Sequence, residues 1–250
     1  MCISDTLFAQ GGYFMPYYYG YYGFDWTYLY LLLPCILLSL WASSNVNSTF
    51  KKYSRQFSRR GLTGAEAAQR VLSTNGVSGV RIERVSGNLT DHFDPKTNVI
   101  RLSDSVYSST STAAIGVACH EAGHAVQYAV NYAPIKLRAA IIPLTNFGSK
   151  IAMPLILGGI LLSFLGAFSS TLVYLGIAAF SLSLVFQLVT LPVEFNASRR
   201  AMDTIESSGL LTREEQQGAR KTLKAAAMTY VAALAASLAS LLRLILITRG

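Results

Sequence analysis

The chain has 250 residues, of which 52% are hydrophobic and only 14% are charged, and its mean hydropathy is +0.37. This composition excludes an ordinary soluble domain, in which about a quarter of the residues are charged. The net charge of +8 could indicate a nucleic-acid partner. However, the basic residues stand beside apolar stretches, as in "KKYSRQFSRR" at 51–60, which favours an anionic membrane surface. We therefore expect a lipid bilayer, and no nucleic acid, as partner.

Four apolar stretches are candidate membrane spans, because a helix needs about 20 apolar residues to cross the hydrocarbon core. They are 28–41, 151–168, 171–193 and 225–247. Lys and Arg are absent from 1–41 and concentrate in 42–150 and 194–224, so these two segments are predicted to face the cytoplasm. Both termini and a turn near Ser169 are then expected outside.

This pattern divides the chain into five segments. Residues 1–41 are an aromatic N-terminal tail and first anchor, 42–143 a cytoplasmic α+β part, 144–193 a transmembrane hairpin, 194–224 a second cytoplasmic segment, and 225–250 the last transmembrane helix. The Tyr- and Gly-rich tail is typical of an interfacial aromatic belt. The predicted fold class is a mainly α membrane protein with about four transmembrane helices and a small cytoplasmic α+β domain.

The cytoplasmic part begins with one short helix and a small sheet. Thr63 and Glu66 form a capping box, and Gly76 ends the helix. "GVRIERVSG" alternates apolar and polar residues, and "NLTDHFDPKTNVIRLS" predicts two strands about a turn at "DPKTN", which makes about three strands. The next helix begins in "SSTSTAA" and continues to Pro134. It is apolar on nearly every side, so we expect it to be buried, with Cys119 as a core residue.

That buried helix contains "HEAGH". His120 and His124 are four residues apart and project from one face, where both imidazoles can bind one metal ion. Glu121 stands beside them as a base for a metal-bound water. The alternative is a pair of core histidines, but burying two imidazoles and a carboxylate without a partner is costly. The spacing therefore predicts a metal site.

A catalytic zinc needs a third protein ligand and an open position. The extended three-histidine pattern is excluded, because Gln127 and Val130 occupy the positions where it requires Gly and His. His92 is the one other histidine. Most acidic residues stand in contexts that predict exposure, namely Glu66, Glu83, Glu206, Glu214 and Glu215.

Glu194 differs from these acids because it follows an apolar run. At helical spacing it shares one stripe with Thr190, Gln187 and Ser183, so the polar edge points away from lipid. Pro192 would loosen the helix there and help to aim the carboxylate. We expect Glu194 to be the third ligand; the alternative is that it only begins the polar segment and pairs with Arg199 or Arg200.

Four motifs carry a family resemblance. "LTDHFDP", "VACHEAGHAVQ", "TLPVEFNASRRA" and "AAAMTYVAA" resemble those of the YugP-type neutral zinc metallopeptidases, which are bacterial membrane proteins, and the resemblance covers nearly the whole chain. More distantly, the order of motifs is similar to HtpX-like and CAAX-type proteases, gluzincins whose third ligand is the Glu of "EFxADR". The resemblance implies one Zn²⁺ per chain, held by His120, His124 and Glu194, with Glu121 as the catalytic base of a metallopeptidase domain built around an HExxH helix.

One position departs from those relatives. Ser198 stands where they carry Asp, so the residue that orients a ligand histidine is open among Ser198, Asn196 and Asp203. The donor for the transition-state oxyanion is also open. Its candidates are His92, Tyr128 and Arg199, although His92 could instead be a turn-flanking residue held by Asp91 or Asp94.

The predicted function is zinc-dependent endopeptidase activity at the cytoplasmic face of a bacterial inner membrane, on a peptide or membrane-protein substrate. The strand at 88–93 is a candidate edge for an extended peptide. Resemblance to HtpX-like proteins alone suggests membrane-protein quality control. The alternatives are a site-2-type intramembrane protease, because the "HEAGH" helix is apolar enough to enter lipid, and a catalytically silent zinc-binding membrane adaptor, against which Glu121 argues. A homo-oligomer or a scaffold partner stays open.

Overall fold

The computed structural model describes Trp26 and residues 28–249, so most of the predicted aromatic tail lies outside the described residues. The secondary structure in chain order is η1 (Tyr28–Leu32), α1 (Leu33–Tyr53), α2 (Gly64–Thr74), β1 (Arg81–Val85), β2 (His92–Asp94), β3 (Val99–Ser103), α3 (Asp104–Tyr107), α4 (Thr112–Ala129), α5 (Ala133–Leu161), η2 (Ser163–Leu165), α6 (Ala167–Ser207) and α7 (Arg213–Arg249). The fold is mainly helical with one small sheet, as predicted.

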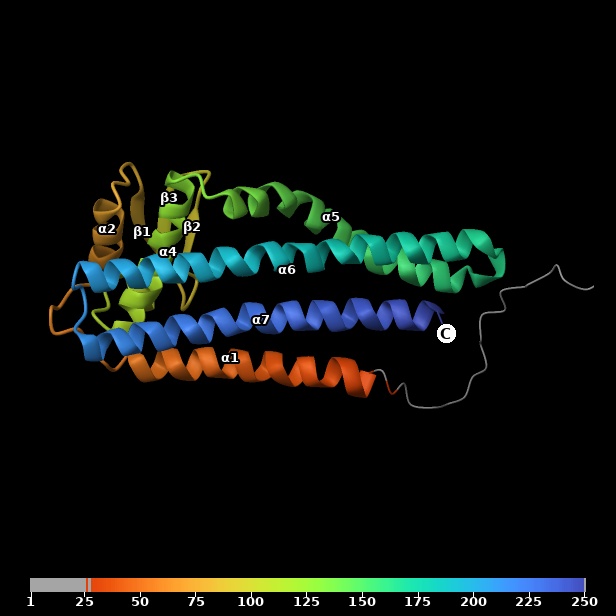
Figure 1. Cartoon of the computed structure of the whole chain (residues 1–250), viewed down its shortest axis with the longest axis horizontal. Helices are drawn as coiled ribbons and strands as arrows, with labels where there is room; N and C mark the ends of the chain where they lie inside the picture. Colours follow the sequence, from red (N-terminus) through yellow and green to blue (C-terminus); the bar gives the residue numbers. More distant parts are fainter. Residues whose placement is uncertain (1–25, 27, 250) are drawn as a thin grey trace, which may run out of the picture.

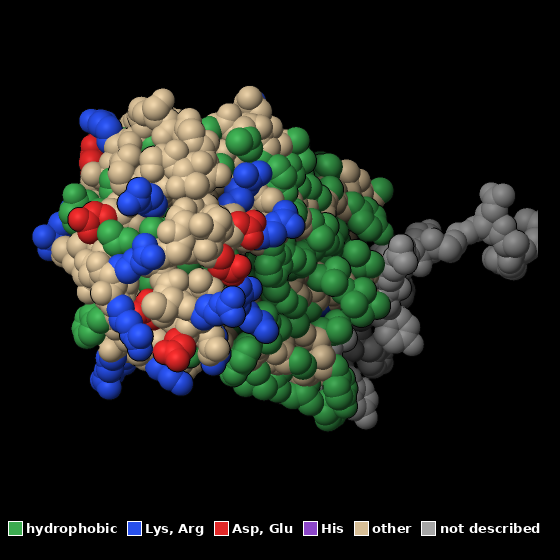
Figure 2. Space-filling model, turned by 60° about the vertical axis from the view of Figure 1, so that its left-hand side comes forward, with side chains coloured by type: hydrophobic (Ala, Val, Ile, Leu, Met, Phe, Trp, Pro, Cys, Tyr) green, Lys and Arg blue, Asp and Glu red, His purple; other side chains and the backbone are tan. Residues whose placement is uncertain are grey.

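Four of the described helical segments are long and apolar enough to cross a membrane: Tyr28–Tyr53, Ala133–Leu161, Ala167–Ser207 and Arg213–Thr248. Helices α1 and α7 run side by side, and α5 folds back along α6 as a hairpin (Figure 1). At one end of these long helices lie α2, α4 and the sheet (Figure 1). Charged side chains gather at that end on the face shown in Figure 2, and apolar side chains cover the helices beyond it.

The three-stranded sheet has the order β1-β3-β2, with β1 parallel and β2 antiparallel to β3. β3 is central and four of its five residues are buried, whereas β2 lies at an edge. The predicted turn between β2 and β3 is closed by Asp94. The Thr97 hydroxyl, the Lys96 N–H and the Arg101 guanidinium all donate to its carboxylate, and they lower its pKa to about 2.

A single apolar core joins the sheet to the helices that meet it. Its largest buried members include Leu72 of α2, Ile100 and Leu102 of β3, Ile115 of α4 and Ile205 of α6. The capping box of α2 forms as predicted, with Thr63 accepting from the Glu66 N–H. Ser111, in the hydroxyl-rich stretch, caps α4 by accepting from the Ala114 N–H at 3.2 Å. Cys119 is fully buried in this core, and burial raises the pKa of its thiol.

Several boundaries differ from the sequence prediction. α5 begins at Ala133, because Pro134 suits the first turn of a helix as well as it ends the preceding one. The hairpin turn lies at 162–166 rather than near Ser169, since Gly166 supplies the positive φ of +58° that the turn requires. α6 continues without a break through Pro192 and Glu194 to Ser207.

The expectation that Glu215 is exposed is wrong. The residue is 4% exposed, and its carboxylate accepts hydrogen bonds from the backbone N–H groups of Arg59 (2.8 Å) and Thr212 (2.9 Å). Glu215 therefore caps the first turn of α7 and ties it to the segment that follows α1. The charge pattern of "REEQQ" did not separate this residue from Glu214, which is exposed.

Gly123 allows α6 to approach α4 beside the two histidines. A Cβ atom at this position would lie 2.7 Å from the Ala197 carbonyl oxygen and 3.4 Å from the Ala197 Cα, which are backbone atoms that cannot move aside alone. Because Ala197 is one turn after Glu194 on α6, this close contact sets how near Glu194 comes to α4.

We expect Gly123→Ala to lower thermal stability, because the methyl group must push α6 away from α4. Overpacking costs about 1–3 kcal/mol, which exceeds the helix-propensity gain of about 0.5–1 kcal/mol. Gly158→Ala in α5 is the matched control, since a Cβ there meets nothing within 4 Å. Thermal unfolding of both variants in detergent checks the prediction; equal unfolding temperatures would contradict it.

Candidate metal centre

Helices α4 and α6 bring three ligand-type side chains together. His120 Nε2 lies 3.2 Å, and His124 Nε2 3.5 Å, from the same Glu194 oxygen, Oε2. The ligand atoms of the three residues all lie within 4.8 Å of one another, so one ion could contact all three. The two histidines are neighbours because four residues make about one turn of α4. Glu194 reaches them from a helix 70 residues further along the chain, and its side chain is 2% exposed.

The opposite ring nitrogen of each histidine has its own polar partner. His120 Nδ1 lies 3.1 Å from the Ser198 hydroxyl, and His124 Nδ1 lies 3.0 Å from Gln127 Oε1. Ser198 therefore contacts a candidate ligand directly, although it is not the aspartate of the related motif. Partners of this kind hold ligand histidines in one orientation and tune their basicity.

Gln127 decides the tautomer of His124. The Gln127 amide group donates to the Val193 carbonyl (2.8 Å) and to Asn196 Oδ1 (3.0 Å), so its own carbonyl oxygen must face His124. His124 Nδ1 then carries a proton and donates it. In the neutral ring this leaves the Nε2 lone pair free and directed toward Glu194.

This arrangement fits a cation. A bare imidazole nitrogen and a carboxylate oxygen are both acceptors, and at 3.5 Å they need a proton or a metal ion between them. A metal ion satisfies Nε2 of both histidines and Oε2 of Glu194 at once, and two imidazoles with one carboxylate form a typical donor set for catalytic zinc. The residues present therefore fit a zinc ion.

Arg138 of α5 holds the second oxygen of Glu194. Its guanidinium donates to Glu194 Oε1 at 3.0 Å, which leaves Oε2 facing the histidines. A carboxylate this buried needs compensating positive charge, and Arg138 supplies part of it. The alternative prediction that Glu194 pairs with Arg199 or Arg200 is wrong, because its ion-pair partners are His120, His124 and Arg138. Arg200 instead donates to Asn196 Oδ1 at 2.8 Å.

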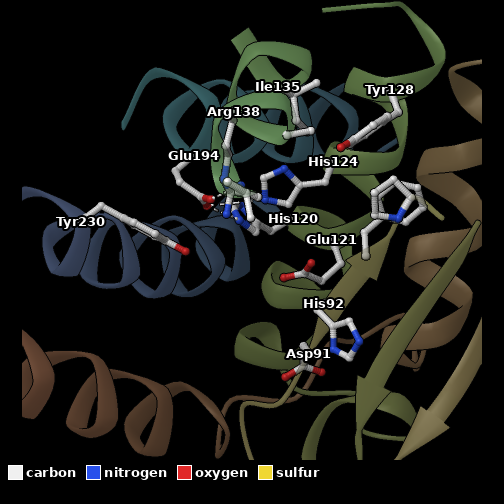
Figure 3. A pocket seen from close by; sticks show the side chains of 14 residues that line it. Asp91, His92, His120, Glu121, His124, Tyr128, Ile135, Arg138, Glu194 and Tyr230 are labelled. Atoms are coloured by element: carbon white, nitrogen blue, oxygen red, sulfur yellow. Dashed lines mark hydrogen bonds and ion pairs between the residues drawn. The ribbon is translucent and has the colours of Figure 1, made fainter. Parts of the chain in front are cut away.

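A cavity of about 270 Å³ opens beside the three ligand-type residues and the edge strand, and we call it the β2 cavity. It is lined by Asp91, His92, Phe93, Pro95, His120, Glu121, His124, Tyr128, Ile135, Arg138, Ala139, Ile142, Glu194 and Tyr230. Figure 3 shows the Tyr230 hydroxyl directed toward the Glu194 and His120 side chains. Among the described residues, none donates a hydrogen bond to the Glu121 carboxylate, which lies free at the cavity wall.

The chain matches one family along nearly its whole length. The family described as "Putative neutral zinc metallopeptidase" matches residues 28–249. The chain belongs to this family. It is also 48% identical over 220 residues to "Putative membrane protease YugP" of Bacillus subtilis (strain 168), which covers 88% of this chain and 96% of the relative. The predicted family resemblance is thereby confirmed. No solved structure matches the chain.

Two of the other predicted site residues, Tyr128 and His92, line the β2 cavity. Tyr128 lines the β2 cavity and packs its ring edge-on against Phe93 at 5.6 Å. His92 also lines it, but its Nδ1 lies 2.9 Å from the Thr90 carbonyl rather than at Asp91 or Asp94. Asp91 accepts two hydrogen bonds from Ser103, and burial raises the pKa of its carboxyl.

Arg199 and Asp203 are not brought to the three ligand-type residues. Both line a separate cavity between α6 and α7, and neither lines the β2 cavity. Helical geometry explains this, because positions 199 and 203 lie four residues apart on a face of α6 turned away from Glu194. Asn196 accepts a hydrogen bond from Gln127 and does not contact a histidine itself, so it acts on His124 only through Gln127.

Three residues of the centre escaped the sequence analysis. Gln127 excludes the three-histidine pattern, and a polar residue three positions after His124 in an apolar helix is also a signal of a buried polar partner. Arg138 stands with Lys136 in the otherwise apolar stretch "APIKLRAAIIP". Tyr230 lies in "AAAMTYVAA", one of the four motifs that carry the family resemblance, but the sequence alone assigns this motif no role.

Proposed function

We propose that this protein is a membrane-bound zinc endopeptidase of the gluzincin type, with His120, His124 and Glu194 as zinc ligands and Glu121 as general base. The observation that carries the proposal is the convergence of two oriented imidazole nitrogens and a buried carboxylate oxygen beside a cavity with a free carboxylate. A site that only stabilised the fold would not need Glu121 at the cavity wall. This favours an enzyme over a silent adaptor.

Each residue then has a distinct task. A zinc ion bound there would polarise the scissile carbonyl and activate a water molecule. Glu121 accepts the proton of that water and later delivers it to the leaving amine. The Tyr230 hydroxyl, which points toward Glu194 and His120, is the best placed donor to the oxygen that gains charge, ahead of His92 and Tyr128 (Figure 3).

The β2 edge offers a place for an extended substrate. β2 pairs with β3 on one side only, and its His92 and Phe93 line the β2 cavity together with Pro95, which follows the strand. A peptide added to this edge would gain main-chain hydrogen bonds and cross the centre. This supports an endopeptidase that binds an unfolded or extended segment of its substrate.

The active site is proposed to face the cytoplasm at the inner membrane. α4 is not among the four candidate spans, and it lies with the sheet at one end of the long helices (Figure 1). Charged side chains gather at that end (Figure 2). Basic residues favour the cytoplasmic side. This favours cleavage at the membrane face over a site-2-type intramembrane protease. A role in membrane-protein quality control and a homo-oligomeric or scaffolded state stay predictions.

Zinc removal tests the proposed function. The purified protein in detergent should hydrolyse an unfolded protein substrate when zinc is bound, lose that activity after chelation, and regain it with zinc but not with magnesium, because imidazole ligands suit zinc. Peptide products are measured by mass spectrometry. Full activity in metal-free protein, or none in zinc-loaded protein, would overturn the proposal.

A further inference from the structure

A second cavity, of about 250 Å³, lies on the other side of the candidate metal centre, and we call it the α1 cavity. It shares five lining residues with the β2 cavity, namely Asp91, His120, Glu121, Glu194 and Tyr230. The two cavities therefore meet at the centre and flank it. A peptide whose scissile carbonyl lies at the centre would place a neighbouring side chain at the mouth of the α1 cavity.

The walls of the α1 cavity are mostly apolar. The apolar part is formed by Val46 and Phe50 of α1, Val117 of α4, and Leu223, Ala226 and Ala227 of α7, and the polar part includes Ser198, Thr222 and Thr229. α1 is thus more than an anchor, because its last turns close one side of this cavity. The alanines on α7 leave the space open, since a longer side chain at either position would enter it.

We infer that the α1 cavity binds a large apolar side chain of the substrate, such as that of Phe, Leu or Met, next to the scissile bond. This inference rests on the proposed function. An engineered cavity of about 150 Å³ already holds benzene, so the α1 cavity has room for an aromatic or branched aliphatic group. Pockets that bind the body of a ligand are typically apolar with a small number of polar groups, as here.

The mouth of the cavity favours a peptide over a lipid chain as the occupant. Asp91 and Glu121 stand where the α1 cavity joins the centre, and an acyl chain entering there would leave both carboxylates desolvated. A peptide instead brings N–H groups that can donate to them. Leu89 also lines the cavity and is 40% exposed. Its φ of +54° is one that a bulky residue rarely adopts, so the loop before β2 holds Leu89 in an unfavourable backbone conformation.

The test uses two peptide hydroxamates, which chelate zinc directly and differ only in carrying a benzyl or a methyl side chain. The zinc-loaded wild type should bind the benzyl compound about 10-fold or more tightly than the methyl compound. Ala226→Leu, which fills the cavity, should abolish this preference while the affinity for the methyl compound and the zinc content stay unchanged. Ala233→Leu, two turns further along the same stripe of α7, is the matched control and should behave as wild type.

A second variant tests the opposite direction and does not depend on how Ala226→Leu folds. Val46→Ala widens the cavity and should raise the affinity for a naphthyl compound relative to the benzyl compound. Equal affinities for the benzyl and methyl compounds in the wild type, or a preference unchanged in both variants, would overturn the inference. The metal site would still be supported in that case, because both compounds bind through the zinc ion. Failure of both compounds to bind the zinc-loaded wild type would instead refute the proposed function, and the inference with it.

Discussion

Glu121→Gln is expected to abolish peptide hydrolysis while zinc remains bound. The amide has nearly the shape of the carboxylate but cannot accept a proton from water, and general base catalysis contributes about 10²–10⁴ in rate. Because Glu121 lies outside the three ligand-type residues and lines the cavity, its replacement should leave the centre intact. We therefore predict a loss of at least about 100-fold in the rate of cleavage of an unfolded protein.

The measurement pairs cleavage rate with zinc content by mass spectrometry on the same purified sample. Glu83→Gln is the control and should retain full activity, because Glu83 lies on the edge strand β1 and pairs with Arg81. Equal cleavage by the Glu121→Gln variant and the wild type would exclude Glu121 as the base. Loss of zinc together with activity would show instead that Glu121 acts on the metal site itself.

Glu194→Gln is expected to weaken zinc binding by more than about 100-fold, because changes to the partners of metal ligands already cost about 10–100-fold. Glutamine keeps the side-chain volume and can still accept from Arg138 through its carbonyl oxygen, so the fold should persist. It loses the negative charge that balances the ion and the half-buried Arg138 guanidinium. Titration with a chromogenic chelator measures the dissociation constant.

The control for this prediction stands on the same helix. Glu206→Gln removes a carboxylate that pairs with Arg220 at the exposed end of α6, and it should leave the zinc affinity unchanged. A wild-type zinc affinity in the Glu194→Gln variant would show that Glu194 is not the third ligand. Circular dichroism of both variants distinguishes loss of a ligand from loss of the helix.

Local spacing made much of the centre predictable. His120, Glu121 and His124 fall within about one helical turn, so their relative placement depends on α4 alone. The stripe through Thr190 and Glu194 indicated that one edge of α6 faces protein, and Thr190 is indeed 2% exposed. The position of Ser198, one turn after Glu194, follows from the same periodicity, and it explains how a hydroxyl there can reach His120.

Contacts between distant segments were not predictable in the same way. Gln127 is oriented by the Val193 carbonyl of α6, and Arg138 pairs with Glu194 across α5 and α6, so neither role is visible within one element. The cap formed by Glu215 depends likewise on the backbone at Arg59. In each case the partner lies more than 50 residues away, and only the packing of helices decides which polar groups meet.

The sequence by itself therefore determined the class of protein, the long apolar helices, the small sheet and the candidate ligands, because composition and helical periodicity are local properties. The tertiary structure alone decided that Gly123 brings α6 against α4, that Arg138 and Tyr230 reach Glu194, and that α1 closes a second cavity beside it. The physical reason is that close packing and buried hydrogen bonds depend on atoms from several helices at once.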